Sequence, residues 1–273
     1  MNSATVQPRL ADAALSTGLR LQYAGSGAPG APAVLLLHGY TDSWLSYSLV
    51  LPHLGPALRC VAPSQRGHGD SERPECCYGL GDFAADAVAL LDALDVRRAT
   101  VVGHSMGSFI AQRIAVDHPE RVERLVLVGS AVHAVNEGII GLNAYVQTLV
   151  APVPREFVHE FQASTIHAPV PPGFLDAVVD ESGKLPARVW RDALHGLMGA
   201  DHAGRLAGIR APTLVLWGDR DGIFPRAEQE LLVETIPDAR LVVYPETGHA
   251  LHWERPERFA RDLEEFIRHP KKP

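Results

Sequence analysis

"VVGHSMGSF", residues 101–109, is the stretch that decides how the rest of the sequence is interpreted. It contains Gly-x-Ser-x-Gly, with an apolar run before it and a helix-compatible run after it. A serine on a tight strand-to-helix turn is held in a strained conformation that projects its hydroxyl outward, and flanking glycines relieve the crowding. The pattern predicts Ser105 as a nucleophile. The next amide, that of Met106, lies at a helix N-terminus and can donate to a developing oxyanion.

Short apolar runs rich in Val and Leu recur along the chain and alternate with amphipathic stretches, which is typical of buried parallel strands covered by helices. The pattern predicts strands at residues 19–24, 33–37, 59–62, 100–102, 124–128, 213–217 and 240–244. It predicts helices at residues 43–54, 80–94, 105–117, 226–235 and 256–268. A mostly parallel sheet in an α/β fold follows.

The alternation stops between the strands at 124–128 and 213–217. Residues 133–208 contain no convincing strand but carry helical patterns at 137–149, 154–164, 172–181 and 186–198, with prolines at the joins. We therefore predict a core domain formed by residues 1–132 and 209–273, and a helical insertion formed by residues 133–208.

Two loops next to predicted strands carry partners for Ser105. In "LLLHGYTDSW", His38 and Gly39 follow a strand, so the amide of Tyr40 can be the second oxyanion donor. In "YPETGHALHWERP", His249 follows the last strand, where a loop histidine can reach the serine and act as its base. His252 is interpreted as pocket wall or surface.

A carboxylate that orients His249 is expected in "LVLWGDRDGIFP", residues 214–225. Two aspartates follow the strand there, Asp219 and Asp221. Asp219 comes directly after Gly218, where an aspartate is well placed to bond its own turn and the amides ahead. The residues alone leave the choice between the two aspartates open.

Composition excludes several classes of function. The chain of 273 residues has 25 basic and 32 acidic residues, a formal charge of −7 and no basic cluster, so nucleic acid is not an expected partner. No segment approaches the roughly 20 apolar residues that span a bilayer, and the N-terminal residues do not resemble an export signal, so a cytoplasmic location is expected. Cys60, Cys76 and Cys77 are interpreted as unreactive thiols in a reducing compartment, with a Cys76–Cys77 bond left open. No histidine or cysteine pattern indicates a metal, and no cofactor is expected.

The stretches "HGYTDSW", "APSQRGHGDSERP", "VVGHSMGS", "PTLVLWGDRDGIFP" and "ETGHALHWERPERFARDLEEFI" together resemble the α/β-hydrolase superfamily. The resemblance implies an eight-stranded, mostly parallel sheet with helices on both faces and a helical cap inserted after the sixth strand. It also implies a triad of Ser105, Asp221 and His249, because the acid of this family commonly falls in a Gly-x-x-Asp pattern. Relatives that open epoxides or remove halide need an aspartate where Ser105 stands, so both activities are disfavoured.

Apolar residues of the insertion suggest a roofed pocket of medium size. We expect the pocket to include His38, His104, Tyr145, Trp190, Ile223 and Trp253. The leading hypothesis is a carboxylesterase that acts on small apolar acyl or aryl esters through an acyl-serine intermediate. The alternatives are a carbon–carbon bond hydrolase of ring-cleavage dienoates, with Arg188 or Arg191 holding a substrate carboxylate, an enol-lactone hydrolase, and a non-catalytic ligand receptor on the same scaffold.

Overall fold

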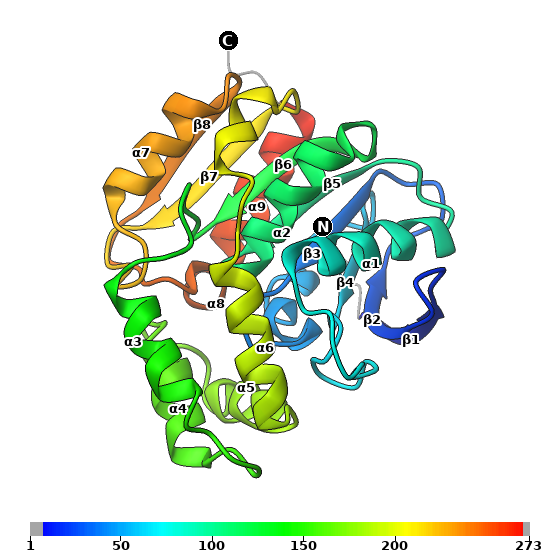
Figure 1. The fold of residues 1–273 in the computed structure, drawn as a ribbon. Helices are drawn as coiled ribbons and strands as arrows, with labels where there is room; N and C mark the ends of the chain where they lie inside the picture. The colour runs from blue at the N-terminus through cyan, green and yellow to red at the C-terminus, as the bar shows by residue number, and fades with distance from the viewer. Residues whose placement is uncertain (1–7, 270–273) are drawn as a thin grey trace.

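One eight-stranded sheet organises residues 8–269, the part of the chain that the computed structural model describes (Figure 1). The strand order is β1-β2-β4-β3-β5-β6-β7-β8, and β2 is antiparallel to both its neighbours while the pairs from β4 to β8 are parallel. The strands are β1 (Arg9–Ala14), β2 (Arg20–Ser26), β3 (Ala33–Leu37), β4 (Arg59–Pro63), β5 (Ala99–His104), β6 (Val122–Val128), β7 (Thr213–Gly218) and β8 (Ala239–Tyr244). The predicted α/β-hydrolase sheet is confirmed.

Alternate residues of the central strands build two separate cores, because successive side chains of a strand point to opposite faces. Leu35 and Leu37 of β3 pack with residues of α1 (Leu80–Ala93), α2 (Met106–Asp117) and α7 (Arg226–Thr235). Val34 and Leu36 pack on the other face with α9 (Pro256–Arg268). Burial on both faces explains why these strands read as continuous apolar runs.

The prediction of a helix at residues 43–54 is wrong. The chain forms two short 3-10 turns there, Trp44–Tyr47 and Leu51–His53. Pro52 lies inside the second turn and lacks the amide hydrogen that a continuous α-helix needs. The turns nevertheless bury Tyr47 and Leu51 against the sheet, as a helix would.

Four helices connect β6 to β7: α3 (Glu137–Val146), α4 (Arg155–Ala163), α5 (Phe174–Gly183) and α6 (Ala187–Met198). We call them the inserted helices. They lie within the predicted helical stretch and gather at one end of the sheet (Figure 1). A short helix, α8 (Leu251–Glu254), follows β8 and was not expected from the sequence.

Strand β1 is also absent from the sequence-based assignment. Its segment, RLADAA, has an alanine-rich composition and an acidic residue, and only Ala13 of the six residues is buried. An edge strand with one buried side chain leaves no hydrophobic alternation to detect. Its place is set by its antiparallel pairing with β2.

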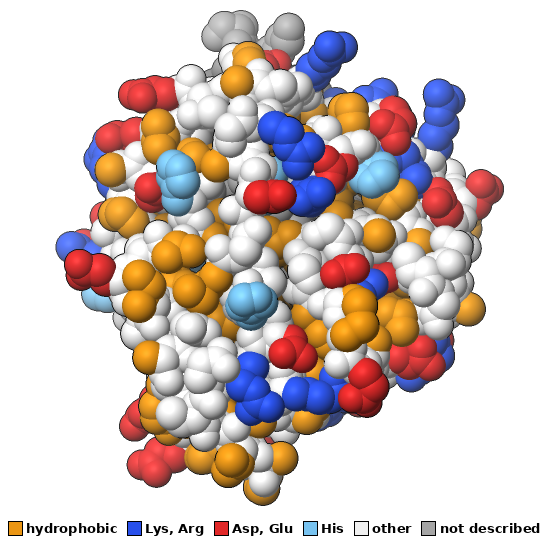
Figure 2. Space-filling view, viewed as in Figure 1, with side chains coloured by type: hydrophobic (Ala, Val, Ile, Leu, Met, Phe, Trp, Pro, Cys, Tyr) orange, Lys and Arg blue, Asp and Glu red, His pale blue; other side chains and the backbone are white. Residues whose placement is uncertain are grey.

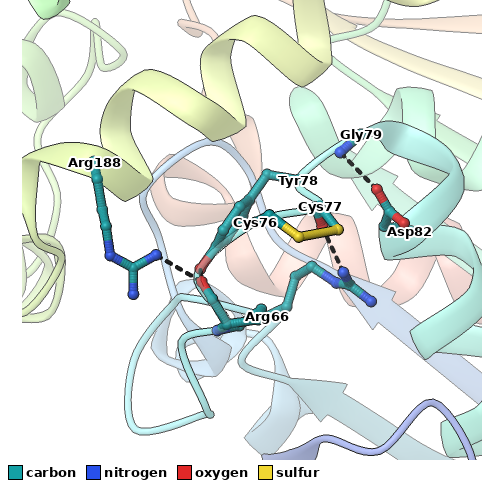
Figure 3. The surroundings of a disulfide bond; sticks show 8 residues. Arg66, Cys76, Cys77, Tyr78, Gly79, Asp82 and Arg188 are labelled. Carbon is teal, nitrogen blue, oxygen red and sulfur yellow. Dashed lines mark hydrogen bonds between the residues drawn. A yellow bond between two sulfur atoms is a disulfide. The ribbon is translucent and has the colours of Figure 1, made fainter.

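The interpretation of all three cysteines as free thiols is wrong for two of them, because a disulfide joins Cys76 to Cys77 (Figure 3). The backbone turns at Cys77, which has a φ of 73°. The Cys77 carbonyl accepts a hydrogen bond from Arg66, which also forms a buried ion pair with Asp86. Cys60 is a free thiol, and burial raises its pKa to about 12.

Charged side chains of both signs are interspersed on the face seen in Figure 2, without a large basic area. Within residues 8–269, no helix is long and apolar enough to cross a membrane. The expectation about an export signal depends in part on residues 1–7, which lie outside the described residues.

Candidate active site

Ser105 occupies the turn between β5 and α2 in a backbone conformation that a residue with a side chain rarely adopts. Its φ is 52° and its ψ is −121°. The glycines beside it allow this turn: a Cβ at Gly103 would lie 2.1 Å from the Gly107 carbonyl oxygen, and a Cβ at Gly107 would lie 2.3 Å from the Leu37 carbonyl oxygen. The Ser105 amide donates to the Val128 carbonyl at 3.0 Å, which ties the turn to β6. Strain of this kind clusters at functional sites.

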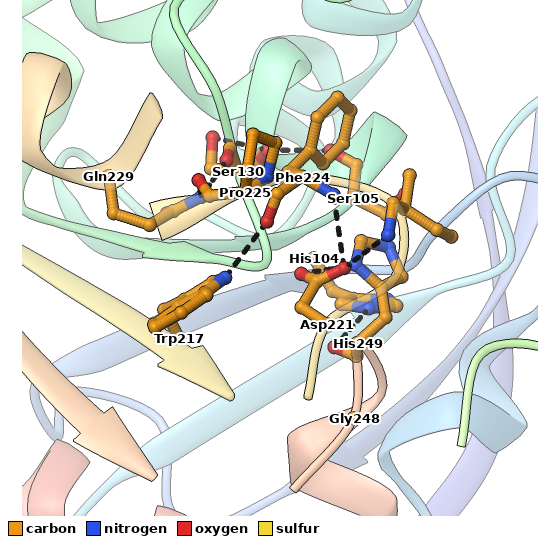
Figure 4. A network of polar contacts seen from close by, with 12 residues as sticks. His104, Ser105, Ser130, Trp217, Asp221, Phe224, Pro225, Gln229, Gly248 and His249 are labelled. Carbon is orange, nitrogen blue, oxygen red and sulfur yellow. Dashed lines mark hydrogen bonds and ion pairs between the residues drawn. The ribbon is translucent and has the colours of Figure 1, made fainter. Parts of the chain in front are cut away.

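His249 and Asp221 meet at the carboxyl ends of β8 and β7 (Figure 4). His249 Nδ1 lies 2.8 Å from Asp221 Oδ2, and the two side chains are 1% and 0% exposed. The other oxygen, Asp221 Oδ1, accepts from the amides of Ile223 at 2.8 Å and Phe224 at 3.1 Å. These two amides fix the carboxylate, so the carboxylate fixes the orientation of the imidazole ring.

From the sequence, Asp219 was expected to bond the amides ahead of it. It does not. Its side chain is 33% exposed and lies 3.9 Å from Arg220 Nε. The amide of Asp221 donates to the Gly218 carbonyl at 3.0 Å, so the chain turns back here and presents Asp221 to the following amides. The expected turn bonds therefore belong to the same aspartate that contacts His249.

His249 Nε2, on the ring edge away from Asp221, is buried and has no hydrogen-bond partner among the described protein residues. Ser105 and His249 both line a small cavity of about 20 Å³. Gly129, at the end of β6, allows the ring to approach, since a Cβ there would lie 2.8 Å from His249 Nδ1.

The two amides expected to form an oxyanion hole are that of Met106, which directly follows Ser105, and that of Tyr40, in the loop after β3. Met106 is the first residue of α2, and the first N–H groups of a helix have no carbonyl partner within it. Tyr40 lines both the small cavity and a larger one. Its hydroxyl donates to the Trp190 carbonyl at 2.6 Å, which links the loop after β3 to α6.

The larger cavity has a volume of about 520 Å³ and lies between the inserted helices and the loop after β7. Apolar side chains of α3, α4 and α6 form much of its wall: Ile139, Leu142, Phe161, Leu194 and Leu197. The remaining wall consists of Tyr40, Ser105, Asn136, Glu137, Gly138, Ser164, Gly222, Ile223, Phe224 and Pro225. No lysine or arginine is among these residues.

Three of the six expected pocket residues line a cavity. Ile223 lines both cavities, while His104 and Trp253 line the small one. His38 does not, because both its ring nitrogens bond backbone groups, those of Gly39 and Gln65.

The other two expected pocket residues pack elsewhere. Trp190 is fully buried between Tyr40, Phe157 and Phe161. Tyr145 is 47% exposed and stacks on Phe157.

Two buried histidines, His104 and His252, lie close to His249. Burial, together with the neighbouring His252 and His249, lowers the pKa of His104 well below its ordinary value. Burial lowers the pKa of His252 to about 3. His252 was expected in the pocket wall or at the surface, but it is fully buried, and its Nε2 lies 3.1 Å from Ser46 Oγ.

Arg188 and Arg191 of α6 do not line the larger cavity, contrary to the role considered for them. Arg188 donates to the carbonyls of Pro74 at 2.6 Å and Arg73 at 2.9 Å. Arg191 donates to the Leu149 carbonyl at 2.7 Å. Both guanidinium groups therefore bond backbone oxygens away from Ser105.

Sequence reasoning missed a polar group beside Ser105. Asp42 and Gln162 line the small cavity and are 3% and 1% exposed. Burial raises the pKa of Asp42 from its usual 3.8 to about 6, although hydrogen bonds from Gln162 and Ser46 oppose the shift. Asp42 stands in the quoted "HGYTDSW" stretch, two residues after Tyr40, so an acidic residue in the loop after β3 was visible in the sequence.

Residues 32–256 match the family described as "alpha/beta hydrolase fold". The chain belongs to this family and is a hydrolase. It is 32% identical to 2-hydroxymuconate semialdehyde hydrolase of Pseudomonas sp. (strain CF600), over 98% of this chain and 97% of the relative. It is 31% identical to a 2-hydroxy-6-oxononadienedioate/2-hydroxy-6-oxononatrienedioate hydrolase of Burkholderia vietnamiensis, over 92% of each chain. A solved hydrolase from Pseudomonas aeruginosa PA01 superposes with a TM-score of 0.83 at 27% identity, over 95% of this chain and 98% of that one.

Proposed function

We propose that Ser105, His249 and Asp221 form a catalytic triad, that the amides of Tyr40 and Met106 form the oxyanion hole, and that residues 133–208 act as a cap over the site. The 2.8 Å contact between His249 Nδ1 and Asp221 Oδ2 supports this assignment. It favours the tautomer in which Nδ1 carries the proton and Nε2 is free to accept one.

In this mechanism Ser105 Oγ attacks a substrate carbonyl while His249 Nε2 takes its proton. The carbonyl oxygen becomes an oxyanion that the two amides stabilise. When the tetrahedral intermediate collapses, His249 returns the proton to the leaving group and an acyl-serine remains. Water then attacks the acyl-serine by the reverse proton transfers.

For the substrate, we propose carbon–carbon bond hydrolysis of a 2-hydroxy-6-oxo-dienoate. The observation that carries this proposal is identity of 31–32% to hydrolases of such compounds over more than nine tenths of the chain. The compounds in those names contain no ester or amide, so a hydrolase that splits them must break a carbon–carbon bond. Before that bond breaks, the proton of the 2-hydroxyl must move to C5, so that the group leaving the carbonyl carbon is a conjugated dienolate, which His249 protonates.

A second candidate, hydrolysis of an apolar ester, is favoured by the wall of the larger cavity. A dienoate carries a carboxylate, and buried carboxylates need a cation or several donors. The wall has no lysine or arginine, and its one charged residue is Glu137. A neutral acyl or aryl ester, or a neutral enol-lactone, avoids this cost.

A direct competition tests the two candidates. We would measure kcat/KM for 2-hydroxy-6-oxo-6-phenylhexa-2,4-dienoate and for p-nitrophenyl esters from acetate to octanoate, with Ser105→Ala as the background. A higher kcat/KM for the dienoate supports carbon–carbon hydrolysis, and a higher value for an ester supports the second candidate. Binding of these compounds without multiple turnovers would reject both in favour of a receptor.

The proposed substrate is a small molecule, and no cofactor enters the mechanism. A cytoplasmic location remains a prediction from the sequence, which fractionation of the producing cells would test.

A further inference from the structure

The small cavity beside Ser105 is lined by buried polar residues as well as by the apolar side chains of Phe161, Ile223 and Trp253. Three elements distant in sequence form it: the loop after β3, which carries Asp42, the helix α4 and the turn after it, which carry Gln162 and Thr165, and the loops of Ser105 and His249. Its volume of about 20 Å³ is sufficient for one water molecule, which needs at least ~10–15 Å³ measured in this way. It is too small for a substrate fragment.

Asp42 and Gln162 are held in place by each other and by neighbouring hydroxyls. Gln162 Nε2 donates to Asp42 Oδ1 at 3.0 Å, and Ser46 Oγ donates to Asp42 Oδ2 at 3.2 Å. Gln162 Nε2 also lies 2.8 Å from Ser182 Oγ in α5. A buried side-chain network of this kind is expensive to build unless its polar groups are satisfied. It therefore presents polar atoms to the cavity at fixed positions.

Two buried ring nitrogens in the cavity's lining residues lack a partner among the described protein residues. They are His249 Nε2 and His104 Nδ1. His249 Nδ1 is engaged with Asp221, so Nε2 occupies the ring edge away from that carboxylate. Buried polar atoms are nearly always hydrogen-bonded, and where the protein supplies no partner a bound molecule commonly does.

The occupant must both donate and accept hydrogen bonds. The Asp42 carboxylate and a free imidazole nitrogen accept and the Ser105 hydroxyl donates, whereas the two N–H groups of Gln162 are engaged with Asp42 Oδ1 and Ser182 Oγ, so Gln162 fixes the carboxylate. An anion next to the Asp42 carboxylate would be repelled, so this cavity does not suit the substrate oxyanion. A water molecule meets both requirements.

We propose that the small cavity binds the hydrolytic water, and that Asp42 and Gln162 position this water beside His249 Nε2. The proposal rests on the acyl-serine mechanism of the proposed function. The water oxygen forms a bond to the acyl carbon while His249 Nε2 takes one of its protons. The bond between the acyl carbon and Ser105 Oγ then breaks, Oγ recovers the proton from His249, and a carboxylic acid leaves.

The placement of Gln162 gives the inserted helices a part in this step. Gln162 lies in α4, whereas Asp42 belongs to the loop after β3, and their hydrogen bond spans 120 residues of sequence. Removal of either side chain should slow the attack of water but not the attack of Ser105.

The test separates acylation from deacylation, with p-nitrophenyl butyrate as the substrate. Asp42→Asn and Gln162→Leu are compared with the wild type by stopped-flow measurement of nitrophenolate release and by mass spectrometry of the intact protein. We expect deacylation to slow by about tenfold to a hundredfold in Asp42→Asn and Gln162→Leu, as for a displaced reactant. A burst of nitrophenolate and an adduct of acyl mass on Ser105 should appear, with the acylation rate within about threefold of the wild type.

Gln112→Leu is the matched control. Gln112 is also a fully buried glutamine, but its amide donates to Ser130 Oγ and to the Ala131 carbonyl, away from the small cavity. It should lower the melting temperature without changing the ratio of acylation to deacylation. Added methanol gives a second readout, because loss of a positioned water should raise the ratio of methyl ester to acid in the Asp42 and Gln162 variants only.

Unchanged deacylation and unchanged methanol partitioning in folded Gln162→Leu would overturn the water site, even where Asp42→Asn fails to fold. Slower turnover in both variants with no adduct on Ser105 at any quench time would instead refute the proposed acyl-serine mechanism. The two failures are therefore distinguishable.

Discussion

The two cavities that meet at Ser105 differ in size and in the residues around them. The larger, of about 520 Å³, has apolar side chains of α3, α4 and α6 in its wall, whereas the smaller, of about 20 Å³, has the buried polar residues Asp42, Gln162 and His249 beside apolar ones. A substrate chain gains free energy by leaving water for apolar walls, whereas a reacting water needs fixed polar partners. On the proposed mechanism, the serine turn separates substrate binding from water delivery, and each prediction below addresses one side of this comparison.

The largest effect is expected from replacing Ser105, which lines both cavities. Ser105→Ala should leave the protein folded and lower turnover by about 10⁴- to 10⁶-fold, because the residues of a triad act as a unit. Activity is measured on the better substrate from the competition above, and circular dichroism checks the fold. Retention of more than about a tenth of the activity would reject Ser105 as the nucleophile.

The next effect concerns Asp221, the carboxylate that contacts His249 Nδ1. Asp221→Asn is nearly isosteric but favours the wrong histidine tautomer, so turnover should fall by up to ~10⁴-fold, by analogy with the serine-protease aspartate. Asp219→Asn is the matched control, since Asp219 is partly exposed and contacts Arg220. Kinetics and melting temperatures of both variants decide the matter. A dead Asp219→Asn beside an active Asp221→Asn would reverse the assignment.

The third prediction concerns the smaller cavity alone, through the response of Asp42 to pH. The pKa of Asp42 is about 6 in the folded protein, above its usual 3.8, so the unfolded chain loses this proton first as the pH rises. The folded state then binds more protons, and its stability falls between about pH 4 and pH 6. Because each pKa unit corresponds to ~1.4 kcal/mol, the loss approaches about 3 kcal/mol.

Asp42→Asn removes this titration. The free energy of unfolding of the wild type minus that of the variant, measured in urea at pH 4 and pH 7, should therefore decrease by up to about 3 kcal/mol. Other groups that titrate in both proteins cancel in this difference. A difference that is constant between the two pH values would contradict the buried position of the carboxyl.

The smallest effect sharpens the apolar side of the comparison. Each methylene that enters the larger cavity should improve kcat/KM by about 0.8 kcal/mol, or roughly fourfold, until the cavity is full. Leu142→Trp should shift the preferred acyl chain to a shorter length, since Leu142 lines this cavity. Tyr145→Trp on the same helix should leave the preference unchanged, because Tyr145 is outside the wall. The same shift in both variants would place Tyr145 in the pocket after all.

Several parts of the fold were accessible from sequence because their cause is local. The strand at Ala33–Leu37 was predicted with the bounds that it has, since five consecutive apolar residues buried on both faces leave a clear pattern. The helix at Pro256–Arg268 was predicted equally well, because proline marks its first position and an apolar stripe follows. Two segments failed for different reasons. Strand β1 has one buried side chain and therefore no alternation, whereas the segment after Ser43 buries residues as a helix would but contains Pro52.

The residues that line the pocket were harder to predict from the sequence. Trp190 and Tyr145 are large aromatic side chains on the inserted helices, but one packs in the core and the other faces solvent. A helix presents residues to every direction around its axis, and only its packing against neighbouring elements decides which ones face a cavity. The same reason explains why Arg188 and Arg191 bond backbone carbonyls rather than lining the site.

The sequence by itself determined the parts of this protein that depend on neighbouring residues: the buried strands, the serine turn between Gly103 and Gly107, and the order of serine, aspartate and histidine along the chain. Backbone sterics and hydrophobic periodicity act over a few residues, so they can be read from one stretch at a time. The Gly-x-x-Asp pattern of the resembled family already indicated Asp221, which does contact His249, whereas only the tertiary structure decided that Asp42 and Gln162 meet in a cavity beside Ser105. These contacts depend on where distant loops are placed by the parallel sheet and the inserted helices, and no local pattern encodes a distance between residues so far apart in the chain.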